Sequence, residues 1–353
     1  MRKFVLLNII SFCFVLSSFG QDPVFSQFNQ ASSALNPALS GNFQGAYKLT
    51  VNYRDQWYSL VGNQMSFKTV YTSFDYKFDP TRKNVLTLGG MFIQDTAGDG
   101  NFKQIRGHLT ASYNMQLSEG AYGKFSNYLS IGTQLGFGQN AVEWGNLWFG
   151  RQFDIPNLQV DTSLPTGEPL PTDQDYKTGV YPDLNLGVAW SGVASRKLSA
   201  HAGIAMAHIN TPSISNYGTI YDKYLRRLTI NGGAKIILDS DLGIIPAFAF
   251  YNQGPSYLLQ IGSSFSYSLI HLRESGFRVG SYLRIANSID GSNLEGLIVS
   301  AMIEKQNLMI GVSYDFTLSE LRLAANSLGG FEISISYISP EGSNYDKPRV
   351  PGY

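Results

Sequence analysis

The sequence contains almost no cysteine, and this absence limits its chemistry. Cys13 is the only cysteine among 353 residues, and it lies in an apolar stretch near the start of the chain. The remaining sequence therefore cannot form an internal disulfide, and it offers no thiolate for nucleophilic catalysis or metal binding. Rigidity and chemistry must come from other residues.

Charged residues are also scarce. They make up 15% of the chain, against about 25% in typical soluble domains. The 26 basic and 26 acidic residues balance, and neither sign is concentrated in a block. Nucleic-acid-binding proteins usually carry a basic patch, so we expect no nucleic-acid partner.

Long hydrophobic runs are missing after the first twenty residues. No later apolar stretch reaches the roughly 18 residues that indicate a membrane-spanning helix. Aromatic residues are nevertheless frequent at 13%, and there are 36 glycines. This composition is typical of an outer-membrane β-barrel, in which hydrophobicity alternates along each strand.

The first twenty residues have the features of a secretory signal peptide. Arg2 and Lys3 form a positive start, residues 4–16 form an apolar core, and small residues precede Gln21. We expect cleavage near Gln21, which removes Cys13 from the mature protein. An uncleaved anchor helix is the alternative, but the apolar core is short.

Residues 102–117 show the main pattern of the chain. Apolar residues such as Leu109 and Tyr113 alternate with polar residues such as His108 and Asn114, which gives a strand one apolar and one polar face. Strands of soluble proteins are usually about 5–6 residues long, whereas membrane-spanning strands need about 9–11. The stretch therefore predicts a strand with lipid on one side and a polar lumen on the other.

The same alternation recurs along the chain and predicts a closed antiparallel transmembrane barrel of about 14 strands within residues 46–338, followed by a tail, 339–353. The predicted strands are 46–53, 67–78, 85–94, 102–117, 128–137, 184–190, 198–206, 228–238, 245–251, 257–269, 277–285, 297–303, 308–316 and 331–337. The longest connections, 138–183, 209–227 and 317–330, all follow odd-numbered strands. Bacterial barrels have short periplasmic turns and longer outer loops, so this parity places both ends of the barrel in the periplasm.

Two connecting segments have unusual composition. Residues 21–45 are rich in Asn, Gln and Ser with scattered apolar residues. We expect an ordered segment without strands in the lumen, in the barrel mouth or in the periplasm; a flexible leader is the alternative.

In the long loop 138–183, Trp144, Trp148 and Phe149 accompany several acidic residues. Exposed tryptophans favour a protein-contact surface, and a lid over the barrel mouth is an equal alternative.

Several polar residues are of types that can carry charge interactions or catalysis. Charges facing lipid are costly, so Arg54, Asp315 and Glu332 should face the lumen or the rims. They either satisfy one another, which we favour, or Arg54 pairs with an acid across the barrel and holds the 21–45 segment or the 317–330 loop. His108 and His201 fall on the polar face, but the sequence has no HExxH motif or strained serine elbow. We therefore expect no enzyme, metal site or cofactor.

Two further stretches lie between predicted strands. Residues 95–100 resemble a calcium loop only faintly, because Ala97 interrupts the acidic series; a hairpin turn is expected. Ser319 and Gly329 have the positions of a start and a stop for a short helix within 317–330. Such a helix would help to close the mouth of the barrel.

Both ends of the sequence after Gln21 resemble the PorP/SprF family. The start, QDPVFSQFNQASSALNPALSG followed by YRDQW, and the end, GVSYDFTLSELRLAANSLGGFEISISY, are similar to that family's opening and closing patterns. Residues 182–183 and 207–212 fit family positions more loosely. The motif residues, which are also candidate partner contacts together with Trp144, Trp148 and Phe149, are Asp22, Pro23, Phe25, Gln27, Asn36, Pro37, Arg54, Gln56, Trp57, Asp315, Phe331 and Glu332.

The resemblance implies an outer-membrane component of the type IX secretion and gliding-motility apparatus of Bacteroidetes. One family branch is linked to a periplasmic ring and to other secretion proteins. Another branch supports a secreted cell-surface adhesin that carries a C-terminal secretion domain. The alternatives are a transport barrel, either a porin or a hydrophobic-substrate channel, and an outer-membrane enzyme.

Overall fold

The computed structural model describes residues 21–58, 65–78, 84–119, 126–167, 175–195, 197–214, 223–239, 241–269, 275–288, 291–319 and 328–340. Four predicted features lie outside these residues. They are the signal peptide, the central part 168–174 of the long loop, the helix expected after Ser319, and the tail beyond residue 340.

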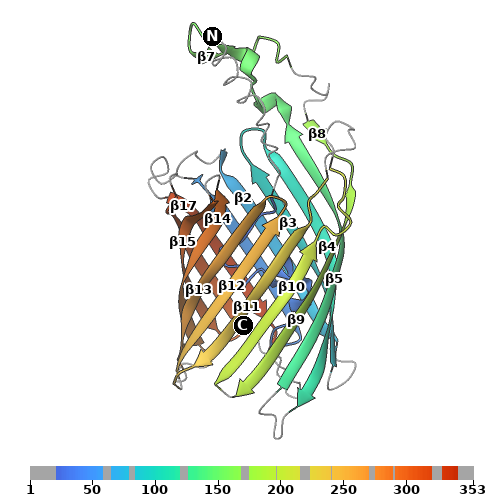
Figure 1. Ribbon diagram of the computed structural model, residues 1–353, viewed down its shortest axis with the longest axis vertical. Helices are drawn as coiled ribbons and strands as arrows, with labels where there is room; N and C mark the ends of the chain where they lie inside the picture. Colours follow the sequence, from blue (N-terminus) through green and yellow to red (C-terminus); the bar gives the residue numbers. More distant parts are fainter. Residues whose placement is uncertain are drawn as a thin grey trace, which may run out of the picture.

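The described strands form a closed antiparallel barrel (Figure 1). Neighbours along the chain pair with one another, and β1 pairs with β17 to close the sheet. Fourteen long strands form the wall, as predicted. They are β1 (Tyr47–Gln56), β2 (Phe67–Phe78), β3 (Asn84–Ala97), β4 (Phe102–Glu119), β5 (Ser126–Glu143), β9 (Tyr181–Ser195), β10 (Leu198–Ala207), β11 (Arg227–Ile237), β12 (Leu242–Gln253), β13 (Ser256–Leu269), β14 (Ser275–Ser288), β15 (Gly291–Lys305), β16 (Leu308–Thr317) and β17 (Leu328–Ile338).

The two faces of the wall have opposite polarity. On β4, Leu109 and Leu117 are 75% and 58% exposed, whereas the inward His108 and Asn114 are 5% and 1% exposed. The outward apolar side chains cover the part of the barrel that faces lipid, and the polar residues face the lumen. No helix among the described residues is long and apolar enough to cross a membrane.

Several strands extend beyond the predicted limits. The first part of the predicted loop 138–183 continues β5 to Glu143, and its last residues begin β9 at Tyr181. These added residues lie at the strand ends, where the lipid no longer selects for alternating apolar side chains. Gly329, predicted to end a helix, lies in β17.

The long connections gather at one end of the barrel, which we call the long-loop end. The segment between β5 and β9 projects from it (Figure 1) and contains η3 (Trp144–Asn146), η4 (Gly150–Gln152), β6 (Phe153–Asp154), β7 (Gln159–Val160) and β8 (Asp175–Lys177). The opposite end, the short-turn end, carries Gln306 and Asn307 between β15 and β16. By the loop-length rule for bacterial barrels, the long-loop end faces outward.

Residues 21–45 lie inside the barrel, and we call them the plug. The plug contains α2 (Ser32–Leu35) and η1 (Pro37–Leu39). It starts near the long-loop end, where Gln21 lines the same cavity as the ends of β1 and β3. It reaches the short-turn end, where Gly45 packs against Ser339 just after β17.

Candidate functional site

The plug is held at three levels by inward side chains. The first level is the Asp22 cluster, formed by Asp22, Arg106, His108, Asp183, His208 and Arg227. The second is the Glu332 cluster, formed by Ser26, Gln27, Arg54, Arg284, Asp315 and Glu332. The third is the turn at Asn36 and Pro37.

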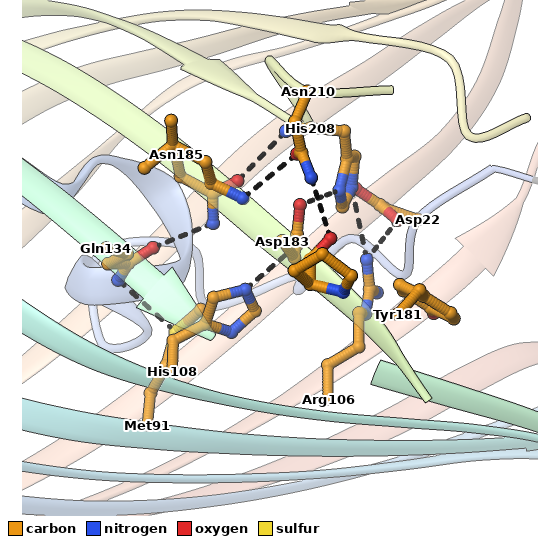
Figure 2. Close-up of polar contacts among 12 residues, drawn as sticks. Asp22, Met91, Arg106, His108, Gln134, Tyr181, Asp183, Asn185, His208 and Asn210 are labelled. Atoms are coloured by element: carbon orange, nitrogen blue, oxygen red, sulfur yellow. Dashed lines mark hydrogen bonds and ion pairs between the residues drawn. The ribbon is translucent and has the colours of Figure 1, made fainter. Parts of the chain in front are cut away.

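The Asp22 carboxylate lies among three cationic side chains. Two of them, Arg106 and His208, are labelled in Figure 2. One oxygen contacts Arg106, and the other lies 2.8 Å from Nε2 of His208 and 3.0 Å from an Arg227 guanidinium nitrogen. Burial would raise the pKa of the Asp22 carboxyl, but the surrounding cations hold that pKa well below its usual range. Asp22 is therefore ionised inside the lumen.

His208 and Asp183 extend the cluster along the wall. His208 follows the last residue of β10, and its Nδ1 lies 2.8 Å from one oxygen of Asp183 on β9. The other Asp183 oxygen lies 2.8 Å from Nε2 of His108 on β4. The His208 ring also stacks on Tyr224 at 4.7 Å. Burial lowers the pKa of His208, but the two carboxylates outweigh burial and raise it, which favours the doubly protonated ring.

The Glu332 cluster binds the next part of the plug through its backbone. The two carboxylate oxygens of Glu332 accept the backbone N–H groups of Ser26 at 2.6 Å and Gln27 at 3.0 Å. Asp315 accepts the Ser26 hydroxyl at 2.8 Å. Charge-assisted hydrogen bonds of this kind are stronger than neutral ones, so this part of the plug is fixed to β16 and β17.

Arg54 joins the wall charges to the plug. It lies 3.0 Å from Asp315, and it also donates to the backbone oxygen of Val24. Arg284 contacts the same Asp315 oxygen at 2.8 Å and the Ser26 hydroxyl at 2.9 Å. Arg54 therefore contacts an acidic residue of the wall and the backbone of the plug.

The Asn36-Pro37 turn packs against the wall backbone. The Asn36 side chain accepts the N–H of Ala38 at 2.9 Å and donates to the carbonyl of Val188 at 3.2 Å. Gly187 lies so close that an added Cβ would overlap the Asn36 side-chain oxygen, and a Cβ on Gly132 would overlap Pro37. These glycines allow the plug to approach the sheet directly.

The other motif residues fall into different environments. Phe25 is buried against Tyr71, with ring centroids 5.5 Å apart, and Gln27 bonds Ser334 at 2.8 Å. Phe331 lies on the outer face beside Tyr53, at 6.0 Å. Trp57 lies beyond β1, next to Phe67 at 6.2 Å. Pro23 and Gln56 line a cavity at the long-loop end.

That cavity, which we call the vestibule, has a volume of about 1010 Å³. Its floor contains plug residues from Gln21 to Val24, together with Arg54 and Arg284, and its walls are the ends of β1 to β4 and β13 to β15. The vestibule is a cup above the plug, which occupies the lumen below it.

The loop between β5 and β9 carries the three predicted aromatic residues, of which Trp148 is exposed and Trp144 and Phe149 are half-buried. Trp148 is 52% exposed and packs beside Phe153 at 6.1 Å. Trp144 begins η3, and Phe149 precedes η4. Nearby Ile155 and Leu158 are 74% and 77% exposed. Trp148, Ile155 and Leu158 therefore present apolar surface outside the barrel.

Sequence reasoning missed most of the Asp22 cluster. Arg106, Asp183, His208 and Arg227 come from four separate segments and meet only through the barrel closure. The weak signal was the loose family match at residues 182–183 and 207–212, which contain Asp183 and His208. Among the described residues, no group of three or more His, Cys, Asp and Glu side chains is arranged to hold a metal ion.

A closed barrel of this size, with an apolar outer band and a lumen filled by its own N-terminal segment, is an outer-membrane β-barrel protein. The family model "Type IX secretion system membrane protein PorP/SprF" matches residues 17–337. The chain therefore belongs to the PorP/SprF family and is an outer-membrane component of the type IX secretion system.

The chain is also similar to solved outer-membrane barrels. The toluene transporter TbuX of Ralstonia pickettii shares 12% identity, with a TM-score of 0.45, over 92% of this chain and 98% of that chain. A mutant of the TodX monoaromatic hydrocarbon channel shares 11% identity, with a TM-score of 0.48, over 87% of this chain and 92% of that one. A Pseudomonas aeruginosa FadL homologue shares 13% identity, with a TM-score of 0.42, over 87% and 93%. No curated protein sequence matches.

Proposed function

We propose that this protein is a non-catalytic docking barrel of the type IX secretion system. In this role it supports the export or surface attachment of a large adhesin-type protein through the C-terminal signal domain of that protein. The observation that carries the proposal is the plug, which fills the lumen and is fixed by ion pairs and hydrogen bonds at two levels. A barrel filled in this way is suited to binding partners at its two ends.

The partner surfaces follow from the shape of the barrel. The loop from η3 to β8 presents Trp148, Ile155 and Leu158 at the long-loop end, and exposed aromatic side chains are frequent at protein interfaces. This loop is the proposed contact for the adhesin. The turns of the short-turn end face the periplasm, and they are the proposed contact for the periplasmic ring.

The test removes the loop without touching the barrel. Glu143 of β5 is paired directly with Asp175 of β8, so a two-residue Asn-Gly turn can replace residues 144–174. A deletion of the whole predicted loop, 138–183, would instead remove Asp183 and the end of β5. The matched control replaces Gln306-Asn307, at the opposite end, by Asn-Gly.

The measurement is affinity isolation of the C-terminally tagged protein from outer membranes, with mass spectrometry of the bound proteins. We expect a large surface protein with the parent chain and with the Gln306-Asn307 control, and its loss with the loop replacement. Capture that survives the loop replacement would contradict the loop assignment. A barrel isolated without secretion proteins, and conducting ions, would favour the transport alternative.

A further inference from the structure

The vestibule contains a feature that the docking role does not use. Phe67, at the start of β2, points into the vestibule and is 44% exposed. On β4, Phe102 is paired with Ala97 of β3, and both also line the vestibule. Because Lys68 is paired with Thr96, Phe67 lies beside Ala97. The three residues form an apolar shelf, with the small Ala97 between two aromatic rings.

A row of hydrogen-bonding groups lies directly below this shelf. Asp95 of β3 is paired with Thr69 on one side and Gln104 on the other. The Thr69 hydroxyl donates to one Asp95 oxygen at 2.6 Å. Gln104 is 6% exposed, and its Oε1 has no hydrogen-bond partner among the described residues. Gln56, paired with Phe67 on β1, adds a further carboxamide beside the shelf.

The charges of the vestibule limit the ligand. Arg54 and Arg284, on its floor, are both paired with Asp315. Asp22 is neutralised by its own cationic partners. Asp95 and Glu295, on the walls, would repel an anionic ligand. The vestibule groups that lack an opposite charge beside them are therefore carboxamides, hydroxyls, carboxylates and aromatic rings.

We propose that the vestibule is a binding site for an uncharged oligosaccharide. The faces of sugar rings are apolar C–H surfaces that pack on aromatic side chains. Their hydroxyls both donate and accept hydrogen bonds, which suits carboxamides and carboxylates that lie side by side. The shelf and the row below it provide these two kinds of contact on one wall. The volume of about 1010 Å³ is at the upper end of the range for ligand pockets, and the site opens at the outward end of the barrel.

The site can be tested on the purified full-length barrel. The detergent should be lauryldimethylamine oxide, because alkyl maltosides and glucosides would present sugars to the site. The probes are maltohexaose, cellohexaose, laminarihexaose and chitohexaose, and the controls are uncharged peptides of Ser, Gly and Asn. The ring centroids of Trp57 and Phe67 are 6.2 Å apart, so the fluorescence of Trp57 reports on the shelf. Titration calorimetry gives the dissociation constant.

We expect at least one of the four oligosaccharides to bind, and Phe67→Ala and Gln104→Ala each to weaken binding by about tenfold. The matched control is Phe74→Ala, because Phe74 is on the same strand but on the lipid-facing side and is 45% exposed. Heat-modifiable gel mobility verifies that each variant is folded.

Three results would overturn the proposal. They are no binding of any oligosaccharide at millimolar concentration, unchanged binding in both the Phe67→Ala and Gln104→Ala variants, and binding of the peptides in place of the sugars. None of these results bears on adhesin capture, which is measured separately.

Discussion

Asp22 and His208 are separated by 186 positions in the sequence, and their side chains meet at 2.8 Å inside the barrel. Asp22 belongs to the plug, and His208 belongs to the wall. Asp183 holds the other nitrogen of the same ring at 2.8 Å, so the imidazole bridges two carboxylates. This bridge fixes the start of the plug beneath the vestibule.

The first prediction concerns the charge of Asp22. In Asp22→Asn, the side chain keeps its shape but leaves Arg106 and Arg227 without their carboxylate partner. Breaking a buried ion pair in this way typically costs about 3–5 kcal/mol, so we expect a clearly lower unfolding temperature. The measurement is the temperature at which the folded band disappears in a heat-modifiability gel.

The control for this prediction is Asp161→Asn. Asp161 lies in the outer loop and bonds Ser163 there, at 2.6 Å. Its replacement should leave the unfolding temperature unchanged. Equal unfolding temperatures for Asp22→Asn and the parent would show that the Asp22 cluster contributes little to stability.

The second prediction concerns pH. The folded pKa of His208 is raised by its two carboxylate partners, and the ordinary value is about 6.5. The stabilisation is therefore fully present below about pH 6.5, and it is lost as the pH rises through the folded value. We expect the free energy of unfolding of the parent to fall between about pH 6.5 and the raised folded pKa of His208. The free energy of unfolding of His208→Gln should depend less on pH. Parallel profiles for the two proteins would rule out His208 as the origin of the pH dependence.

The third prediction concerns the contact between the plug and the wall. Gly187→Ala would place a methyl group against the Asn36 side chain, and overpacking of this kind costs about 1–3 kcal/mol. Gly90→Ala is the matched control, because that glycine is also in a strand but the nearest atom to an added Cβ is 3.4 Å away. Thermal unfolding of the two variants should show a larger loss for Gly187→Ala. A larger loss at Gly90 would contradict the direct approach of the plug.

The fourth prediction concerns the permeability of the lumen. In planar bilayers, we expect the parent barrel to show no steady open-pore conductance, because the plug lies in the lumen. Glu332→Gln replaces the carboxylate that accepts the backbone N–H groups of Ser26 and Gln27. The plug is then bound less firmly, and we expect transient openings of the pore. Glu143→Gln, at the outer end of β5 beside Lys103, should remain silent. A steady conductance in the parent would contradict a filled lumen.

The sequence was sufficient to predict the barrel because the signal for each strand is local. Leu109 and His108 fall on opposite faces because neighbouring residues of any strand do so. Numbering the strands along the chain then shows that the longest connections follow odd-numbered strands. Some strands were predicted too short, because apolar and polar side chains stop alternating where a strand leaves the lipid. Asn140 and Glu143 of β5 are examples. The Asp22 cluster could not be derived, because which inward residues meet depends on register and closure. Arg106 and His108 were visible as inward polar residues, but their partners were not.

The position of the plug has a consequence for assembly. Glu332, on the last strand, and Arg54, on the first strand, both contact the segment that precedes the first strand. Because the plug binds both edges of the sheet, it links β1 to β17 through the lumen in addition to their direct pairing. Docking of the plug and closure of the barrel therefore stabilise each other.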